Sequence, residues 1–148
     1  MGYTHYFSKV GTTRDDALRF EMFARGARTI IEYATKQDGI QLADAMGEKL
    51  GEWEVSDSLV SFNGYGAESH ETFFWDADAS GFNFCKTAYK PYDAVVTACL
   101  IHLKDIYGEA VSIGSDGDWS EWSDGARLYR NATGLTAENP MTPEEAVA

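Results

Sequence analysis

The chain has 148 residues, of which 24 are Asp or Glu and 12 are Lys or Arg, and its formal net charge is −12. This length is typical of one domain, and it allows enough surface burial to fold without disulfides or metals. The negative charge repels phosphate backbones and so argues against direct nucleic-acid binding. Two interpretations remain: the charge keeps the protein in solution, or it mimics nucleic acid and blocks a basic groove on another protein.

Cysteine content and hydropathy favour the reducing cytoplasm. Cys85 and Cys99 are too few for a disulfide framework, and there is no CxxC motif. Residues 1–5 lack the basic and apolar regions of a signal peptide. The longest apolar run, residues 94–103, is too short to cross a bilayer. The sequence therefore predicts a cytoplasmic protein that is not bound to a membrane.

The N-terminal third predicts a strand followed by a long helix. Residues 2–7 are rich in Tyr, Thr and Phe, which favours a strand. Thr13, with an acid three residues later, resembles a capping box, and apolar residues then recur at steps of three and four. An Asp-Gly pair provides the stop, so we expect a helix over about residues 13–37. The pattern of residues 40–51 is ambiguous and fits a short helix.

The middle of the chain predicts a hairpin, a loop and a second helix. Residues 59–63 and 71–76 look like strands, and an Asn-Gly turn with a polar connection between them indicates an antiparallel hairpin. Residues 77–84 are rich in turn formers and are expected to form a loop. Pro91 opens the second helix because proline fits the first helical turn. One apolar face of this helix continues to Ile106.

The C-terminal third predicts a short strand over residues 111–114, and then a turn at residues 115–118 that leads into a third helix. Residues 135–148 have no periodicity, and we expect this tail to be flexible or docked on a neighbour. The order of elements predicts a single α+β domain over residues 1–134. Its sheet is expected to be small and mostly antiparallel, with about four strands and three helices packed on it.

Two candidate site clusters lie on the predicted strands. Tyr3 and His5 share one face of the first strand, because side chains alternate along a strand. A histidine beside tyrosines can bind a polar ligand or act as an acid or base, and a hydrogen-bonded strand histidine near the sheet edge is the alternative. Asn63 and Glu71 belong to the hairpin, where the glycine after Asn63 allows close approach of a ligand and the glutamate can act as a base. A plain hairpin loop is the alternative there.

A third cluster surrounds the start of the second helix and contains Lys86, Thr87, Lys90 and Asp93. Helix N-termini attract anions, and nearby lysines reinforce that attraction. The cluster is not a P-loop, because its glycines and GK[ST] spacing are absent. The sequence therefore predicts contact with a phosphate or carboxylate here, with ordinary helix capping as the alternative.

The sequence predicts no metal site. Residues 115–118 place acids at alternate positions, but an EF-hand needs glycine at its sixth position, which is Glu121 here, and glutamate at its twelfth, which is Arg127. His5, His70 and Cys85 do not have zinc-ligand spacing. Any cofactor stays unidentified.

Six short motifs, GYTHY, FNG, ETF, FCKT, KPYD and SDGD, are spread over residues 2–118. In these motifs the chain resembles a family of small uncharacterised proteins of bacteriophages and phage-derived elements, in which tryptophan often stands where Phe7 stands here. The resemblance implies a protein that works inside the host bacterial cell in host takeover or counter-defence. It assigns no catalytic residue.

Three functions are left open by these observations, as is the question of whether the protein is an enzyme or a homo-oligomer. The leading hypothesis is a phage-type accessory protein that binds a small anionic ligand, such as a nucleotide, in a polar, aromatic pocket. The residues expected to line it are Tyr3, His5, Asn63, Glu71, Lys86, Thr87, Lys90 and Asp93. The second is an acidic inhibitor of a host protein that mimics nucleic-acid charge. The third is a small hydrolase or transferase that uses His5 and Glu71 as acid and base.

Overall fold

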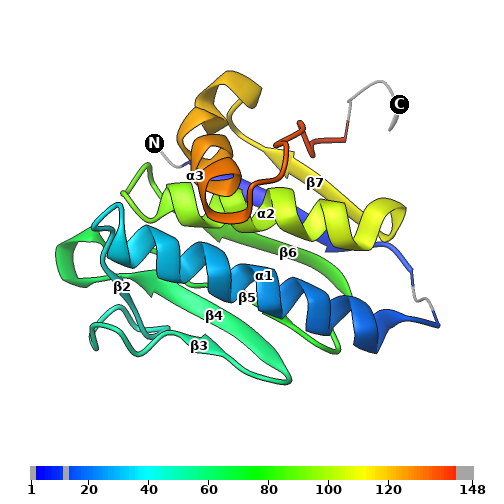
Figure 1. Ribbon diagram of the computed structural model, residues 1–148, viewed down its shortest axis with the longest axis horizontal. Coiled ribbons are helices and arrows are strands. Elements are labelled where there is room, and N and C mark those ends of the chain that lie inside the picture. Colours follow the sequence, from blue (N-terminus) through cyan, green and yellow to red (C-terminus); the bar gives the residue numbers. More distant parts are fainter. Residues whose placement is uncertain (1–2, 12–13, 143–148) are drawn as a thin grey trace.

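The computed structural model describes residues 3–11 and 14–142, which form a layer of three helices on antiparallel strands (Figure 1). The main elements in chain order are β1 (Thr4–Lys9), α1 (Asp16–Lys36), β2 (Leu42–Ala43), β3 (Glu54–Val55), β4 (Leu59–Gly64), β5 (Phe73–Asp76), β6 (Gly81–Lys86), α2 (Asp93–Tyr107), β7 (Val111–Ser115) and α3 (Ser123–Thr133). Short 3-10 turns are found at Gly66–Glu68, Gly108–Ala110 and Trp119–Trp122.

The strands form two sheets in which every described pairing is antiparallel. The first has the order β6–β1–β7, and the second has the order β2–β4–β3, with β5 also paired to β4. In the first sheet His5 lies opposite Cys85 on β6 and Ser115 on β7. The predicted α+β class is confirmed, as is the hairpin of β4 and β5. The strands are more numerous than the four expected, and they are divided between two sheets.

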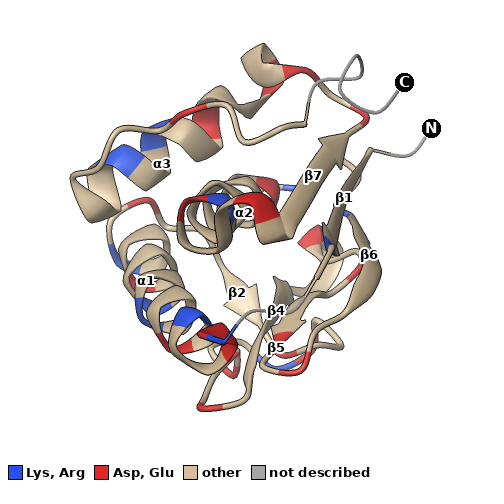
Figure 2. Ribbon diagram, turned by 90° about the vertical axis from the view of Figure 1, so that its right-hand side faces the viewer, with Lys and Arg blue, Asp and Glu red and all other residues tan. Residues whose placement is uncertain are grey.

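The helices gather on one side of the β6–β1–β7 sheet and leave its other face uncovered (Figure 2). Alternation along β1 sends Tyr3, His5, Phe7 and Lys9 inward, where all four are buried. α2 is buried on almost every side, because α1, α3 and β7 all pack against it. A helix that is apolar all round is typical of such a central position. The first turn of α2 therefore lies next to the first residues of β1 and the last residues of β7.

α1 follows the predicted period of apolar residues. Its buried residues, from Phe20 to Ala34, recur at three- and four-residue steps and face the core. The helix ends just before Gly39, whose positive φ of 68° suits glycine. The predicted capping residue Thr13 lies outside the described residues.

Two sequence predictions of local structure are wrong. Residues 40–51 do not form a helix: β2 pairs with β4, and Gly47 and Gly51, both with positive φ, turn the chain. Residues 77–84 are only partly a loop, because β6 begins at Gly81 and pairs with β1 along its whole length. In both places pairing with distant strands decides the conformation, and local propensity does not report such pairing.

The described part of the tail, residues 135–142, docks on the outer edge of β7. The Thr142 amide donates to the Ile113 carbonyl at 2.8 Å, and the Thr142 and Ser112 hydroxyls lie 3.1 Å apart. Residues 143–148 lie outside the described residues. No helix within residues 3–11 and 14–142 combines the length and apolar character needed to cross a bilayer.

Candidate functional site

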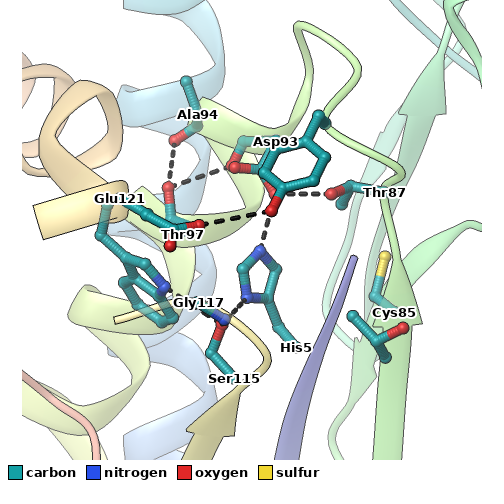
Figure 3. Close-up of polar contacts among 12 residues, drawn as sticks. His5, Cys85, Thr87, Asp93, Ala94, Thr97, Ser115, Gly117 and Glu121 are labelled. Carbon is teal, nitrogen blue, oxygen red and sulfur yellow. Dashed lines mark hydrogen bonds and ion pairs between the residues drawn. The ribbon is translucent and has the colours of Figure 1, made fainter. Parts of the chain in front are cut away.

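A buried histidine on β1 is the centre of a hydrogen-bonded network that joins both sheet neighbours to α2 (Figure 3). The His5 side chain is 0% exposed. Its Nε2 lies 2.6 Å from Asp93 Oδ1 in the first turn of α2, and its Nδ1 lies 2.8 Å from Ser115 Oγ at the end of β7. Thr87, which follows β6, donates to the same Asp93 oxygen at 2.6 Å. The structure thus unites His5, Thr87 and Asp93, three of the eight predicted site residues.

The hydrogen bonds assign the roles of the His5 ring nitrogens. An ionised carboxylate only accepts hydrogen bonds, so Nε2 donates to Asp93. Neutral imidazole then has an acceptor at Nδ1, and the Ser115 hydroxyl donates to it. Every polar atom of the His5 ring is therefore paired within the chain.

Ser115, His5 and Asp93 have the residue types of a nucleophilic triad, but the serine oxygen is already occupied. Besides donating to His5, Ser115 Oγ accepts from the Gly117 amide at 3.0 Å and from Trp122 Nε1 at 3.3 Å. A hydroxyl has two acceptor lone pairs, and both are used here. The arrangement therefore fastens β7 to β1 and to the turn before α3, and it leaves no lone pair aimed at a substrate.

Two tyrosines extend the network to the surface. Tyr3 packs edge-on against His5 with 4.9 Å between ring centroids, and Tyr89 stacks on Tyr3 at 3.9 Å. Tyr3 is 1% exposed, whereas Tyr89 is 66% exposed. Tyr3, another predicted site residue, thus joins the His5 network, and Tyr89 is the outermost ring of the stack.

The turn that carries Tyr89 has a strained backbone. φ is 53° at Ala88 and 61° at Tyr89, so two consecutive residues with side chains adopt the left-handed conformation. Such positions cost about 1–3 kcal/mol each and cluster at functional sites. The amides of Thr87 and Ala88 both donate to the Tyr3 carbonyl, at 3.0 and 3.3 Å. These bonds and the ring stack hold Tyr89 over Tyr3.

The Tyr3 hydroxyl has no hydrogen-bond partner among the described residues, although it is buried. It lies against Gly117, where any Cβ would overlap it. Burial raises the pKa of this hydroxyl, and the Asp93 and Glu121 carboxylates raise it further, so the phenol stays protonated. The nearby Ser115 hydroxyl offsets part of that rise in the Tyr3 pKa. An unpaired buried polar group costs about 1–3 kcal/mol, so Tyr3 marks an unsatisfied position in the site.

Glu71 and Lys86 belong to a second cluster beside the first. Glu71 Oε1 accepts from the Lys86 amide at 2.8 Å, and the Glu71 carbonyl accepts from Tyr92 Oη at 2.6 Å and from Cys85 Sγ at 3.4 Å. Burial and the nearby Glu71 carboxylate raise the pKa of the Cys85 thiol, which disfavours the nucleophilic thiolate. Among the described residues no hydrogen bond joins Glu71 to His5, so the two residues of the acid–base hypothesis lie in separate networks.

Asn63 closes a loop and lies in neither cluster. Its Nδ2 donates to the carbonyls of Ala45 and His70, and its Oδ1 accepts from the amides of Gly64 and His70. All of its hydrogen-bonding capacity is used. Asn63 therefore fixes the connection between β4 and β5.

Lys86 and Lys90 are partly exposed and form no ion pair among the described residues. The amides at the start of α2 do not form an open cradle between them. The Asp93, Ala94 and Val95 amides donate to carbonyls of the preceding turn, at 2.8, 3.4 and 2.9 Å. An anion at this helix start would rest on the two ammonium groups alone.

Five cavities of the described surface lie away from the predicted site. One of about 430 Å³ lies between α1 and the end of β3 with the residues after it, and one of about 380 Å³ lies among α1, α2 and the end of α3. Three smaller hollows have volumes of about 290, 310 and 370 Å³. None of these five is lined by any of the eight predicted residues.

The uncovered face of the β6–β1–β7 sheet carries three aromatic side chains that the sequence analysis missed. Phe82 is 64% and Phe84 is 53% exposed, and Tyr6 stacks on Phe82 with 6.0 Å between centroids. We call Tyr6, Phe82 and Phe84 the aromatic face. The alternation of Phe82-Asn83-Phe84 was a strand signal, but the turn formers before it favoured a loop.

Carboxylates border the aromatic face and the Tyr89 turn. Asp116 accepts from Tyr6 Oη at 2.8 Å and from the Thr4 amide at 3.1 Å, and Glu121 Oε2 accepts from Tyr89 Oη at 3.3 Å. Residues 105–126, which supply both acids, contain six acids and no Lys or Arg. This surface is therefore aromatic and bordered by carboxylates, with Lys86 on the same face at the end of β6.

No group of three or more His, Cys, Asp or Glu side chains among the described residues is placed to hold a metal ion. Comparisons of the chain with protein-family models, with curated proteins and with solved structures find no match.

Proposed function

We propose that the protein is an accessory binding protein that uses its aromatic face and the adjoining carboxylates to occupy a basic surface of another protein. This is the acidic-inhibitor hypothesis of the sequence, and the resemblance to phage proteins implies a partner in the host bacterial cell and a role in takeover or counter-defence. The observation that carries it is the exposure of Phe82 and Phe84 on a sheet face that no helix covers. Exposed clusters of large apolar side chains are typical of interaction sites.

The composition of this surface fits a protein partner. Aromatic side chains are enriched in the energetic centres of protein interfaces, and arginine is their common counterpart. The carboxylates of Asp116 and Glu121 complement positive charge, and a net charge of −12 attracts basic surfaces over longer distances.

The backbone of β6 adds hydrogen-bonding groups beside the aromatic face. Thr87 donates to the Tyr3 carbonyl, and by strand alternation the amides and carbonyls of Phe82 and Phe84 point away from β1. These groups have no partner among the described residues, whereas the opposite sheet edge is bonded by Thr142. An extended partner segment can bond such an edge.

Affinity capture from bacterial lysate tests the proposal. The wild type is expected to retain a basic protein at low salt, and Phe82→Ala with Phe84→Ala is expected to lose it. Leu18→Ala, which removes an exposed side chain of α1, is the matched control and should retain the partner. Because exposed charges contribute, capture should weaken as salt increases. Capture that is equal for all three proteins, or insensitive to salt, would contradict the proposal.

One observation favours the small anionic ligand as a second candidate: Lys86 and Lys90, which precede and follow Thr87 in the sequence, form no ion pair with any described residue. Calorimetric titration with linear and cyclic nucleotides tests this candidate. Heat that disappears in Lys86→Ala and Lys90→Ala would support it. No heat with any nucleotide would remove it.

A further inference from the structure

The uncovered face of the β6–β1–β7 sheet differs between its two sides (Figure 2). Side chains point outward from alternate positions of a strand, and cross-strand partners point the same way. The register places the outward residues in three rows, which read Lys86, Phe84 and Phe82 along β6, and Asp116, Gly114 and Ser112 along β7 and the residue after it. The β6 side is therefore bulky and ends in a cation, whereas the β7 side is small and ends in an anion.

The bulky side forms a ridge and the small side leaves a hollow. Phe82 and Phe84 are 64% and 53% exposed, with 5.9 Å between their ring centroids. A Cβ built at Gly114 would meet only the Tyr6 ring, at 4.0 Å. Two packed sheets lie about 10 Å apart, so large side chains of one sheet fit opposite small ones of the other. The ridge and the hollow of this face can meet only across two copies.

We propose that two copies of the chain pair through this face, about a two-fold axis that runs along β1. The rotation exchanges the β6 side with the β7 side and keeps each row in place. The Phe84 ring of one copy then lies over Gly114 of the other. Lys86 of one copy lies opposite Asp116 of the other. Each contact occurs twice, as in any isologous dimer.

The charges of the first row support this pairing. Among the described residues neither Lys86 nor Asp116 forms an ion pair, and Asp116 accepts only from the Thr4 amide and the Tyr6 hydroxyl. A second copy brings the cation and the anion together on both sides of the axis. The net charge of −12 on each chain opposes association, and a face of three strands is small for a dimer interface. The dimer is therefore weak.

Self-pairing goes beyond the proposed function, because it covers the aromatic face while no partner is present. A basic partner is attracted by the net charge that repels a second copy, so it displaces that copy. Salt acts differently on the two complexes. Raising salt screens the repulsion between acidic copies, whereas it weakens attraction to a basic partner.

Sedimentation velocity from about 10 µM to 1 mM tests the pairing, because a weak contact dissociates in this range. The wild type is expected to convert from monomer to dimer as concentration rises, and raised salt should not reverse this. Gly114→Val fills the hollow and should remain a monomer. Gly11→Val, at an exposed glycine without positive φ outside the sheet, is the control and should dimerise. A wild type that stays monomeric, or a dimer that Gly114→Val leaves intact, would overturn the pairing.

A charge exchange tests the geometry of the pair. Lys86→Glu and Asp116→Lys each place like charges opposite each other twice, and each alone is expected to weaken dimerisation about tenfold or more. Mixed in equal amounts, the two variants should associate, because the introduced glutamate then lies opposite the introduced lysine. Variants that are folded by circular dichroism but do not associate on mixing would overturn this arrangement. If Asp116→Lys does not fold, the comparison of wild type with Gly114→Val still decides.

The two proposals fail separately. Dimer formation without capture of a basic protein would support the pairing and reject the proposed function. Capture by a chain that is monomeric at every concentration would overturn the pairing and leave the proposed function standing.

Discussion

His5 is held in the fold by hydrogen-bond partners that could not be predicted from the spacing of residues in the sequence. Asp93 is 88 positions away and Ser115 is 110 positions away, yet both bond the same ring. Because both ring nitrogens are paired, the buried imidazole costs the fold little. The main role of the network is thus to hold β1, β7 and α2 together. The exposed aromatic group next to it, Tyr89, lies outside the hydrogen bonds of the network.

Removing the acceptor at the centre of this network should be costly. Asp93→Ala leaves His5 Nε2 and the Thr87 hydroxyl without their acceptor, and each buried unpaired group costs about 1–3 kcal/mol. Urea denaturation should therefore show a clear loss of stability at constant m value. Asp57→Ala, at an exposed aspartate whose side chain has no hydrogen bond to a described residue, should change stability little. Equal effects of the two substitutions would refute a fastening role.

The backbone strain at the Tyr89 turn also predicts that a substitution by glycine increases the stability of the protein. Ala88→Gly removes the steric penalty of a side chain at φ 53° and should stabilise the protein by up to about 1 kcal/mol, net of the entropy that glycine loses. Ala67→Gly, at an exposed residue without positive φ, should be neutral or destabilising. Thermal denaturation of both variants tests this difference, and a loss of stability in Ala88→Gly would show that the turn is not strained.

At the scale of elements, α1 and α2 approach each other closely where Gly26 meets His102. A Cβ at Gly26 would overlap the His102 ring, which also packs on Phe23 with 5.7 Å between centroids. Burial lowers the pKa of His102, with the Met22 carbonyl and Asp105 opposing part of that effect. The neutral ring is consequently a condition of this helix packing.

This packing makes stability depend on pH. Below the unfolded-state pKa of about 6.5, His102 binds a proton in the unfolded chain but not in the folded one, so stability falls as pH falls from 7 towards 5. His102→Gln should flatten that part of the profile, as urea midpoints at several pH values would reveal. His70→Gln, at an exposed histidine, is the control and should keep the slope. An unchanged slope in His102→Gln would contradict the assignment.

The elements that the sequence predicted well are those whose signals are local. α1 and α2 have apolar faces of helical period, and the β4–β5 hairpin has its turn residues between two apolar runs. β2 and β6 were missed because each is defined by a distant partner, β4 and β1 respectively. Without β6 as a strand, the aromatic face could not be predicted, since Phe82 and Phe84 share a surface with Tyr6 only through this pairing.

The candidate site residues were predicted to cluster according to their positions along the chain. In the structure they are brought together instead by the pairing of strands. Tyr3, His5, Thr87 and Asp93 converge, because β1, β6 and α2 meet at one end of the sheet. Asn63 instead fixes a loop, and Glu71 caps the Lys86 amide. Chain spacing carries no information on which strand ends meet, so such separations were not predictable.

At the scale of the whole molecule, positive charge is absent from long parts of the chain. Residues 50–85 contain seven acids and no Lys or Arg, and residues 105–126 contain six acids and none. These two segments contain residues 81–85 of β6, which ends at Lys86, and all of β7, the outer strands of the β6–β1–β7 sheet. The sheet that presents the aromatic face therefore draws most of both edges from segments rich in acids, and this favours a basic partner over an anionic ligand.

Native mass spectrometry of the protein, purified gently from bacterial cells, tests the central claim most directly. The account predicts a complex with a basic protein that dissociates as salt is raised, and no small adduct. A reproducible added mass the size of a nucleotide, without a protein partner, would contradict the account and restore the small-ligand hypothesis.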